Sequence, residues 1–159
     1  MTDTTPEIAE MVRTRLMALS GAERFRMGAE MFEAARRMAT TLDSGGKSLV
    51  LISSTAARIG SPNVYVDYAG SKAAVDALAI GLSKELAADG VRVNCVRPGL
   101  IDTEIHACGG LPDRVRDLAP NVPMQRGGRP QEVAQAILWL LSDQASYTTM
   151  GLLDVSGGR

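Results

Sequence analysis

The chain has 159 residues, of which 45% are hydrophobic, and its formal net charge is −1. This length is sufficient for one domain with its own hydrophobic core. The nearly balanced charge provides neither the basic excess typical of nucleic-acid binding nor a charge run that would favour a membrane surface.

Three further features concern the cellular setting. The longest apolar runs, such as 49–52 and 136–141, are too short to span a bilayer. The N-terminus lacks the positive start and apolar stretch of a signal peptide. The only cysteines, Cys95 and Cys108, show neither metal-binding nor disulfide spacing. We therefore expect a cytoplasmic protein with no metal and with neither nucleic acid nor membrane as a partner.

Residues 1–46 contain helical patterns only. Thr5 and Pro6 are typical of a helix start, and apolar residues recur at helical spacing from Ile8 to Leu19. A capping-box pattern at 20–23 predicts a second helix that ends before Gly45. We treat 1–46 as a helical N-terminal segment, distinct from a second region at 47–159.

From residue 47 the pattern alternates between strands and helices. Short apolar runs predict strands at 48–53, 91–96 and 152–155, and apolar periodicity predicts helices at 69–88 and from 130 onward. Strands joined by crossover helices form parallel sheets. The predicted fold is therefore α/β, a partial doubly wound sheet of about three strands preceded by two helices. We expect the strand at 48–53 to be buried on both faces, and 98–128 to be a long irregular connection.

Three side chains are candidates for proton transfer. Tyr68 and Lys72 stand one helical turn apart on the same face of the predicted helix. A positive charge near a phenol favours its ionised form, which makes such a pair a plausible general acid and base. Ser54 follows the first strand, where its hydroxyl would reach a substrate oxygen. Taken alone, a Tyr–Lys pair at this spacing is more often a solvated surface, and a serine there more often only ends a strand.

The ordered set of these residues resembles the signature of the short-chain dehydrogenase/reductase family. Its elements are Ser54, the Tyr68-Ala69-Gly70-Ser71-Lys72 segment, the 92–99 segment Arg-Val-Asn-Cys-Val-Arg-Pro-Gly, and Thr103. The resemblance covers 47–159, the C-terminal catalytic half of such an enzyme. It implies an NAD(P)(H)-dependent oxidoreductase that interconverts an alcohol and a carbonyl.

The resemblance also implies roles for individual residues. Tyr68 would donate and accept the proton, Lys72 would favour its ionised form and hold the nicotinamide ribose, and Ser54 would orient the substrate oxygen. Pro98, Gly99, Ile101 and Thr103 would surround the nicotinamide, and Asn94 would be structural. In this family the helix that carries Tyr68 forms a subunit interface, so a homo-oligomer is expected.

Two features depart from the family pattern. Ser54 lies fourteen positions before Tyr68 (68 − 54), where thirteen is more usual, and we expect 61–63 to accommodate the extra residue. The second departure is larger, because the chain has no glycine-rich turn for the cofactor pyrophosphate. Residues 20–42 either occupy the position of the family helix that precedes the serine strand or belong to an unrelated helical segment.

Two functional hypotheses follow. The first is an oxidoreductase of the short-chain type that binds NAD or NADP weakly and acts on a small alcohol or carbonyl. The segments 60–67 and 105–123 would shape its pocket, and they resemble the branch that includes sugar dehydrogenases. The alternative is a truncated or fused, catalytically inactive relic that acts at most as an oligomerising module. His106, the only histidine, lies where it could contact a substrate, but a lone loop histidine is more often solvated, and this is what we expect. Trp139 is expected to lie in the core or a subunit interface.

Overall fold

The computed structural model describes residues 47–108 and 110–159. Within them, three strands form one parallel sheet in the order β1-β2-β3: β1 (Lys47–Ile52), β2 (Val91–Pro98) and β3 (Leu152–Val155). The three-stranded parallel α/β sheet predicted from the sequence is thus confirmed. The helices expected within 1–46 lie outside the described residues.

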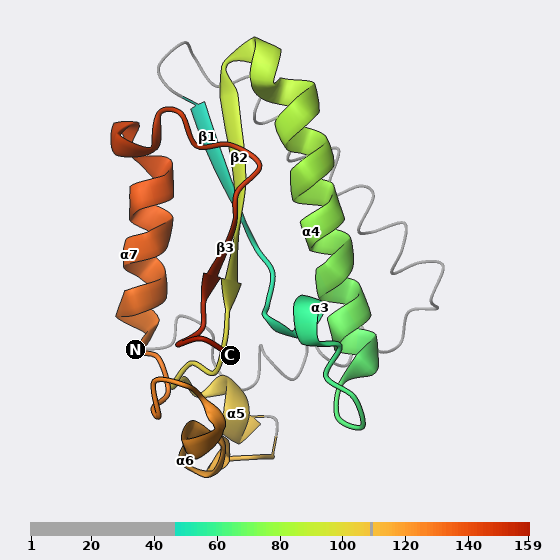
Figure 1. Ribbon diagram of the computed structural model, residues 1–159, viewed down its shortest axis with the longest axis vertical. Helices are drawn as coiled ribbons and strands as arrows, with labels where there is room; N and C mark the ends of the chain where they lie inside the picture. Colours follow the sequence, from blue (N-terminus) through green and yellow to red (C-terminus); the bar gives the residue numbers. More distant parts are fainter. Residues whose placement is uncertain (1–46, 109) are drawn as a thin grey trace. The chain divides into compact units, whose positions relative to one another are not determined.

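Two long helices cover opposite faces of this sheet, α4 (Val66–Leu86) and α7 (Pro130–Leu141) (Figure 1). The register aligns Leu49 with Val93 and Ile52 with Val96, so β1 and β2 end at the same edge of the sheet. The core lies where β2 meets the two helices. Its fully buried side chains include Leu82, Leu140, Val91, Val93 and Val96.

The boundaries of α4 reflect its sequence. Its buried residues Ala69, Ala79, Leu82 and Leu86 recur at helical spacing and pack toward β2. A short 3-10 turn, η1 (Ala87–Asp89), follows, and Gly90 ends it in the left-handed conformation, with φ of 74°. Glycine adopts that conformation at no steric cost, as a helix end of this kind requires.

A carboxylate stabilises the first turn of α7. Glu132 accepts a hydrogen bond of 2.7 Å from the backbone N–H of Arg129, and it binds Arg126 through contacts of 2.6 and 2.8 Å. Pro130 occupies the first turn, where its missing N–H costs nothing. The hydrogen bonds from Arg126 lower the pKa of Glu132 to about 2, so this carboxylate remains charged throughout the physiological range.

The connection between β2 and α7 is more ordered than the sequence predicted. Two short helices, α5 (Ile105–Cys108) and α6 (Arg114–Leu118), and the 3-10 turn η2 (Ala119–Asn121) interrupt it. Another short helix, α3 (Ala56–Ile59), follows β1 and was also missed. Helices of four or five residues contain about one turn each, too little for sequence periodicity to show. In Figure 1, α5 and α6 lie beyond the carboxyl end of β2.

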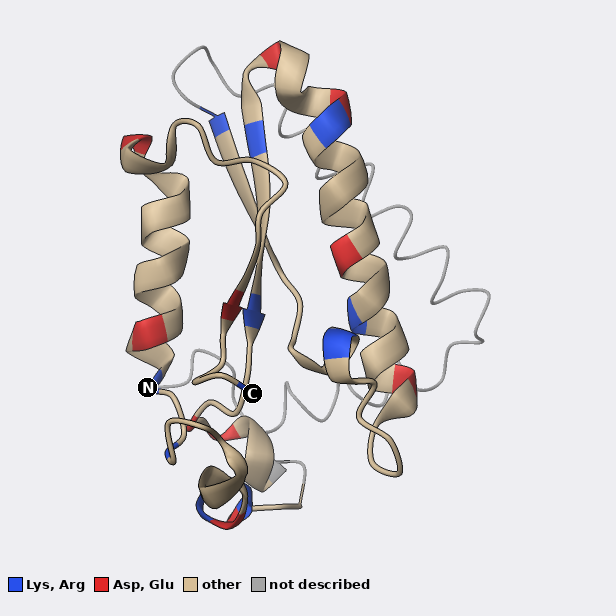
Figure 2. Cartoon of the chain, in the orientation of Figure 1, with Lys and Arg blue, Asp and Glu red and all other residues tan. Residues whose placement is uncertain are grey.

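Buried polar contacts fix β2 between α4 and the segment around β3. Arg97 forms an ion pair with Asp76 of α4 at 2.8 Å and lies 3.7 Å from Asp154 of β3. The basic and acidic positions meet at the carboxyl ends of β2 and β3 (Figure 2). Asn94 is fully buried; its amide donates to the Thr148 carbonyl at 2.8 Å and accepts from the Gly151 N–H at 2.9 Å. The sequence analysis expected this structural role for Asn94.

For the described part of the chain, one burial prediction was wrong and a second was wrong in one of its two alternatives. Most of β1 is half-exposed and Ile52 is 43% exposed, because β1 pairs with β2 on one side and no described strand covers its other edge. Trp139 is 41% exposed on α7, so it does not lie in the core; the other location expected for it, a subunit interface, stays a prediction.

The described residues contain neither a membrane-spanning helix nor a metal site. Among these residues no helix is long and apolar enough to cross a membrane. Within the same ranges, no cluster of histidine, cysteine and carboxylate side chains has the arrangement of a metal site.

Candidate active site

A cavity of about 620 Å³ opens at the carboxyl ends of β1 and β2. Ligands bind at this edge in parallel α/β sheets, and the volume is within the range typical of small-molecule pockets. All the expected site residues line it: Ser54, Tyr68, Lys72, Pro98, Gly99, Ile101 and Thr103. The structure therefore brings together, from three separate segments, the residues that the sequence analysis singled out.

Two hydrogen bonds connect the end of β1 to α4. The Ser53 hydroxyl donates to the backbone carbonyl of Lys72 at 3.0 Å, and the Lys72 ammonium donates to the Ile52 carbonyl at 3.1 Å. These contacts fix the residue that follows them, Ser54, relative to the helix that carries Tyr68. Ser53 is buried and structural, whereas Ser54 is half-buried and faces the cavity.

The hydroxyl of Ser54 is oriented for donation. Its oxygen accepts a hydrogen bond of 3.1 Å from the backbone N–H of Ala56. A hydroxyl has one proton to donate, and this contact leaves that proton available. Ser54 can therefore donate a hydrogen bond to an oxygen atom of a ligand in the cavity.

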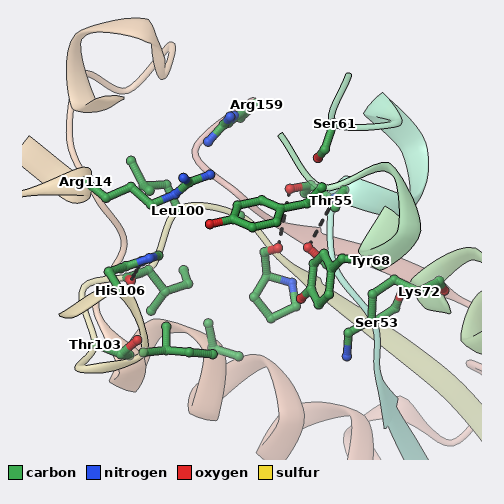
Figure 3. Close-up of a pocket in the computed structure, with 18 of the residues that line it drawn as sticks. Ser53, Thr55, Ser61, Tyr68, Lys72, Leu100, Thr103, His106, Arg114 and Arg159 are labelled. Carbon is green, nitrogen blue, oxygen red and sulfur yellow. Dashed lines mark hydrogen bonds between the residues drawn. The ribbon is translucent and has the colours of Figure 1, made fainter. Parts of the chain in front are cut away.

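Tyr68 is accessible and has a cation beside it. Its side chain is 43% exposed, and within 47–108 and 110–159 its hydroxyl has no hydrogen-bond partner. The Lys72 ammonium lies 5.7 Å from the centroid of the Tyr68 ring. Figure 3 shows both side chains at the same side of the cavity. A ligand oxygen can thus approach Tyr68 without breaking an existing contact.

The wall formed by 98–103 is held by backbone hydrogen bonds on several sides. The Pro98 carbonyl accepts from the Thr55 N–H at 3.0 Å, and the Gly99 N–H donates to the Val155 carbonyl at 3.0 Å. Further along, the Asp102 N–H donates to the Gly128 carbonyl at 2.8 Å. These hydrogen bonds hold the backbone of 98–103 in place at this side of the cavity.

Gly99 is required by close packing. A Cβ atom at this position would lie 2.7 Å from the Cα of Ser156 and 2.8 Å from its Cβ, closer than real Cβ atoms approach such neighbours. Any larger residue would push 98–103 away from the segment after β3. The glycine of the Pro98-Gly99 pair thus sets the position of the wall.

The segment before Tyr68 contains unusual backbone conformations. Ser61 and Asn63 have positive φ angles of 43° and 62°. Such values are uncommon for residues other than glycine. They occur where the sequence places one residue more than usual between Ser54 and Tyr68, as expected for a loop that accommodates an insertion. Ser61 lines the cavity.

Several polar lining residues were not identified as site residues from the sequence. Tyr65, Arg114 and His106 all face the cavity. The His106 ring nitrogen Nε2 lies 2.8 Å from the Ile101 carbonyl, so the expectation of a merely solvated histidine was wrong. Because a carbonyl only accepts, Nε2 carries the proton in this contact. The only indication in the sequence was that these residues lie in 60–67 and 105–123, the segments expected to shape the pocket.

Comparison with known proteins decides the family. The family model described as "Enoyl-(Acyl carrier protein) reductase" matches residues 28–159. The chain belongs to the short-chain dehydrogenase/reductase family. The match begins nineteen residues before the start of the resemblance described above (47 − 28).

Several relatives support this assignment. The chain is 58% identical over 127 residues to "Uncharacterized oxidoreductase YgfF" of Escherichia coli, which covers 80% of this chain and 51% of the relative. It is 41% identical to the 3-oxoacyl-[acyl-carrier-protein] reductase FabG of Thermotoga maritima, over 70% of this chain and 44% of that protein. A solved glucose/ribitol-type dehydrogenase from Brucella melitensis superposes with a TM-score of 0.72 at 34% identity, over 80% of this chain and 51% of that structure.

The chain spans about half the length of the curated relatives it matches. The cavity described above is formed by residues within the matched half. What those relatives do as whole enzymes can be extended to this chain only as a proposal.

Proposed function

We propose that this chain carries the acid–base site of an NAD(P)(H)-dependent oxidoreductase that interconverts an alcohol and a carbonyl. The observation that supports the proposal most strongly is the shared cavity of Ser54, Tyr68 and Lys72 beside the 98–103 wall. Membership of the short-chain family agrees with it.

In this proposal Tyr68 moves the proton. During oxidation its phenolate takes the proton from the substrate hydroxyl, and during reduction its hydroxyl gives the proton back to the carbonyl oxygen. Ser54 donates a hydrogen bond to the same oxygen and orients it. The Lys72 ammonium, 5.7 Å from the Tyr68 ring centroid, stabilises the negative charge on the phenolate. A nicotinamide bound in the cavity would accept or supply the hydride.

The described residues fit one end of such a cofactor. Gly99 allows the 98–103 wall to pack against Ser156, and residues of this wall line the same cavity as Tyr68 and Lys72. The sequence has no glycine-rich turn to hold a pyrophosphate. We therefore propose that the chain holds the nicotinamide end and contributes little to binding the phosphates.

A turnover assay tests this function. NADH and NADPH are supplied at millimolar concentration, because weak binding then does not prevent catalysis, and small aldehydes, ketones and keto sugars are added. Slow, carbonyl-dependent loss of the cofactor absorbance is the expected result. No loss with any carbonyl would favour the alternative of an inactive relic, which the absence of a glycine-rich turn from the sequence supports.

A further inference from the structure

The charged side chains that line the cavity are all cationic. They are Lys72, Arg114 and Arg159, and none of the lining residues is an aspartate or glutamate. The Lys72 ammonium already donates to the Ile52 carbonyl, beside Tyr68. A cavity lined in this way favours a ligand with negative charge.

Arg114, at the start of α6, is available to bind such a charge. Within 47–108 and 110–159 its guanidinium has no carboxylate partner, although Arg116 on the same short helix binds Asp113 at 2.9 Å and Asp117 at 3.1 Å. Four other arginines, Arg58, Arg97, Arg126 and Arg129, also pair with carboxylates. Among the described residues, Arg114 and Arg159 therefore both line the cavity with guanidinium donors that have no hydrogen-bond partner, and Arg114 is the one that an aromatic ring holds in place.

An aromatic ring holds Arg114 in position. The guanidinium carbon lies 5.2 Å from the centroid of the Tyr65 ring, a cation–π contact, and the side chain is half-buried. An arginine held this way loses less conformational freedom when it binds, and its planar group matches a carboxylate or phosphate with two parallel hydrogen bonds. Figure 3 shows Arg114 across the cavity from Tyr68 and Lys72.

We propose that Arg114 is a specificity residue that binds an anionic group, a carboxylate or a phosphate, of the alcohol or carbonyl substrate. The reacting carbon would lie at Tyr68, with the charged group at the opposite side of the cavity. This inference rests on the proposed function for the identity of the reacting group. It replaces the neutral sugar suggested by the sequence with an anionic keto or hydroxy compound.

Binding to matched ligand pairs tests the proposal without requiring turnover. The probes are 4-oxopentanoate with its methyl ester, and dihydroxyacetone phosphate with dihydroxyacetone, each titrated into the full chain and followed by NMR. We expect the anionic member of at least one pair to bind about tenfold or more tightly than its neutral partner, the size of one charge-assisted contact. The pair with the larger ratio distinguishes a carboxylate from a phosphate.

Two variants identify the residue responsible. Arg114→Met should lower the affinity for the preferred anion by about 10- to 100-fold and leave the neutral ligand unchanged. Arg116→Met is the matched control, because it removes a guanidinium from the same helix that already has carboxylate partners, and it should change neither affinity.

Several outcomes would overturn the proposal. These are equal binding within both pairs, an equal loss in Arg116→Met, or no binding of any of the four ligands at millimolar concentration. The proposed function fails separately: charge-selective binding that depends on Arg114, in a chain with no turnover, would support the anion site and contradict the oxidoreductase.

Discussion

The Asp76–Arg97 pair is the main charged contact of the core. Arg97 reaches the Asp76 carboxylate through Nε at 3.1 Å and a terminal nitrogen at 2.8 Å, and both side chains are at most 15% exposed. Hydrogen bonding to Asp76 raises the pKa of Arg97 still further, which keeps it charged. Losing one partner of a buried pair leaves an uncompensated charge, which is costlier than removing both partners.

We predict that Asp76→Asn lowers the free energy of unfolding by about 3 kcal/mol. The value lies at the lower end of the usual range because Asp154 remains 3.7 Å from Arg97. The double variant Asp76→Asn with Arg97→Met should be more stable than the sum of the two single effects. Urea denaturation of the four proteins measures this, and a loss below about 1 kcal/mol in Asp76→Asn would show that the pair contributes little.

Cys95 provides a prediction about pH. It is fully buried on β2, and this burial, followed by the nearby negative charge of Asp76, raises the pKa of its thiol to about 11. Because the thiolate is the reactive form, Cys95 should remain unreactive at pH 8 while the chain is folded.

Iodoacetamide labelling followed by peptide mapping checks this. We expect labelling of Cys95 to be on the order of 100-fold slower in the folded chain than in guanidinium, since a two-unit rise in pKa alone removes that much thiolate. Rapid labelling of the native protein would contradict the buried position of β2. Mapping separates this site from Cys108.

At the scale of elements, the sequence predicted what periodicity and chemistry could reveal. The three strands, α4 with its end at Gly90, and α7 from Pro130 all follow from apolar spacing and from glycine and proline signals. The helices α3, α5 and α6 could not be predicted in this way, because a helix of about one turn is too short for apolar residues to recur at helical spacing. Arg114 was missed for a related reason. Its importance depends on what lies near it in space, namely Tyr65 and a cavity without carboxylates.

The free edge of β1 predicts self-association. Within the described ranges β1 pairs only with β2, and an open strand edge favours pairing with another chain. The exposed small residues of α4, such as Gly70 and Ala77, allow close helix packing as a second contact surface. Sedimentation at micromolar concentration should show a dimer or larger species. A clean monomer would contradict the prediction. If Ala77→Glu dissociates the oligomer, the contact between subunits is made by packing of α4.

In the molecule as a whole, the residues expected for proton transfer and those expected for phosphate binding are not equally represented. The proton-transfer residues and the 98–103 wall are present, whereas the sequence contains no glycine-rich turn and the chain spans about half of its relatives. Charge-assisted hydrogen bonds to phosphates contribute about 1.5–3 kcal/mol each, and losing two or three of them weakens binding by several orders of magnitude. We therefore expect the chain to retain the residues for proton transfer while it binds the cofactor weakly.

Calorimetric titration measures the affinity directly. We predict dissociation constants for NADH and NADPH well above the micromolar range. A micromolar constant would mean that 1–46 or a second subunit supplies a phosphate site that the sequence analysis did not detect.

The role of Tyr68 is tested most directly by comparing the turnover of wild type with that of Tyr68→Phe at millimolar NADPH and a saturating carbonyl. The substitution removes only the hydroxyl, which has no hydrogen-bond partner among the described residues, so the fold should be retained, as circular dichroism will verify. We predict slow turnover by wild type and a rate lower by about 10²–10⁴-fold in Tyr68→Phe. Equal rates would show that Tyr68 is not the acid, and would contradict the role assigned to this cavity.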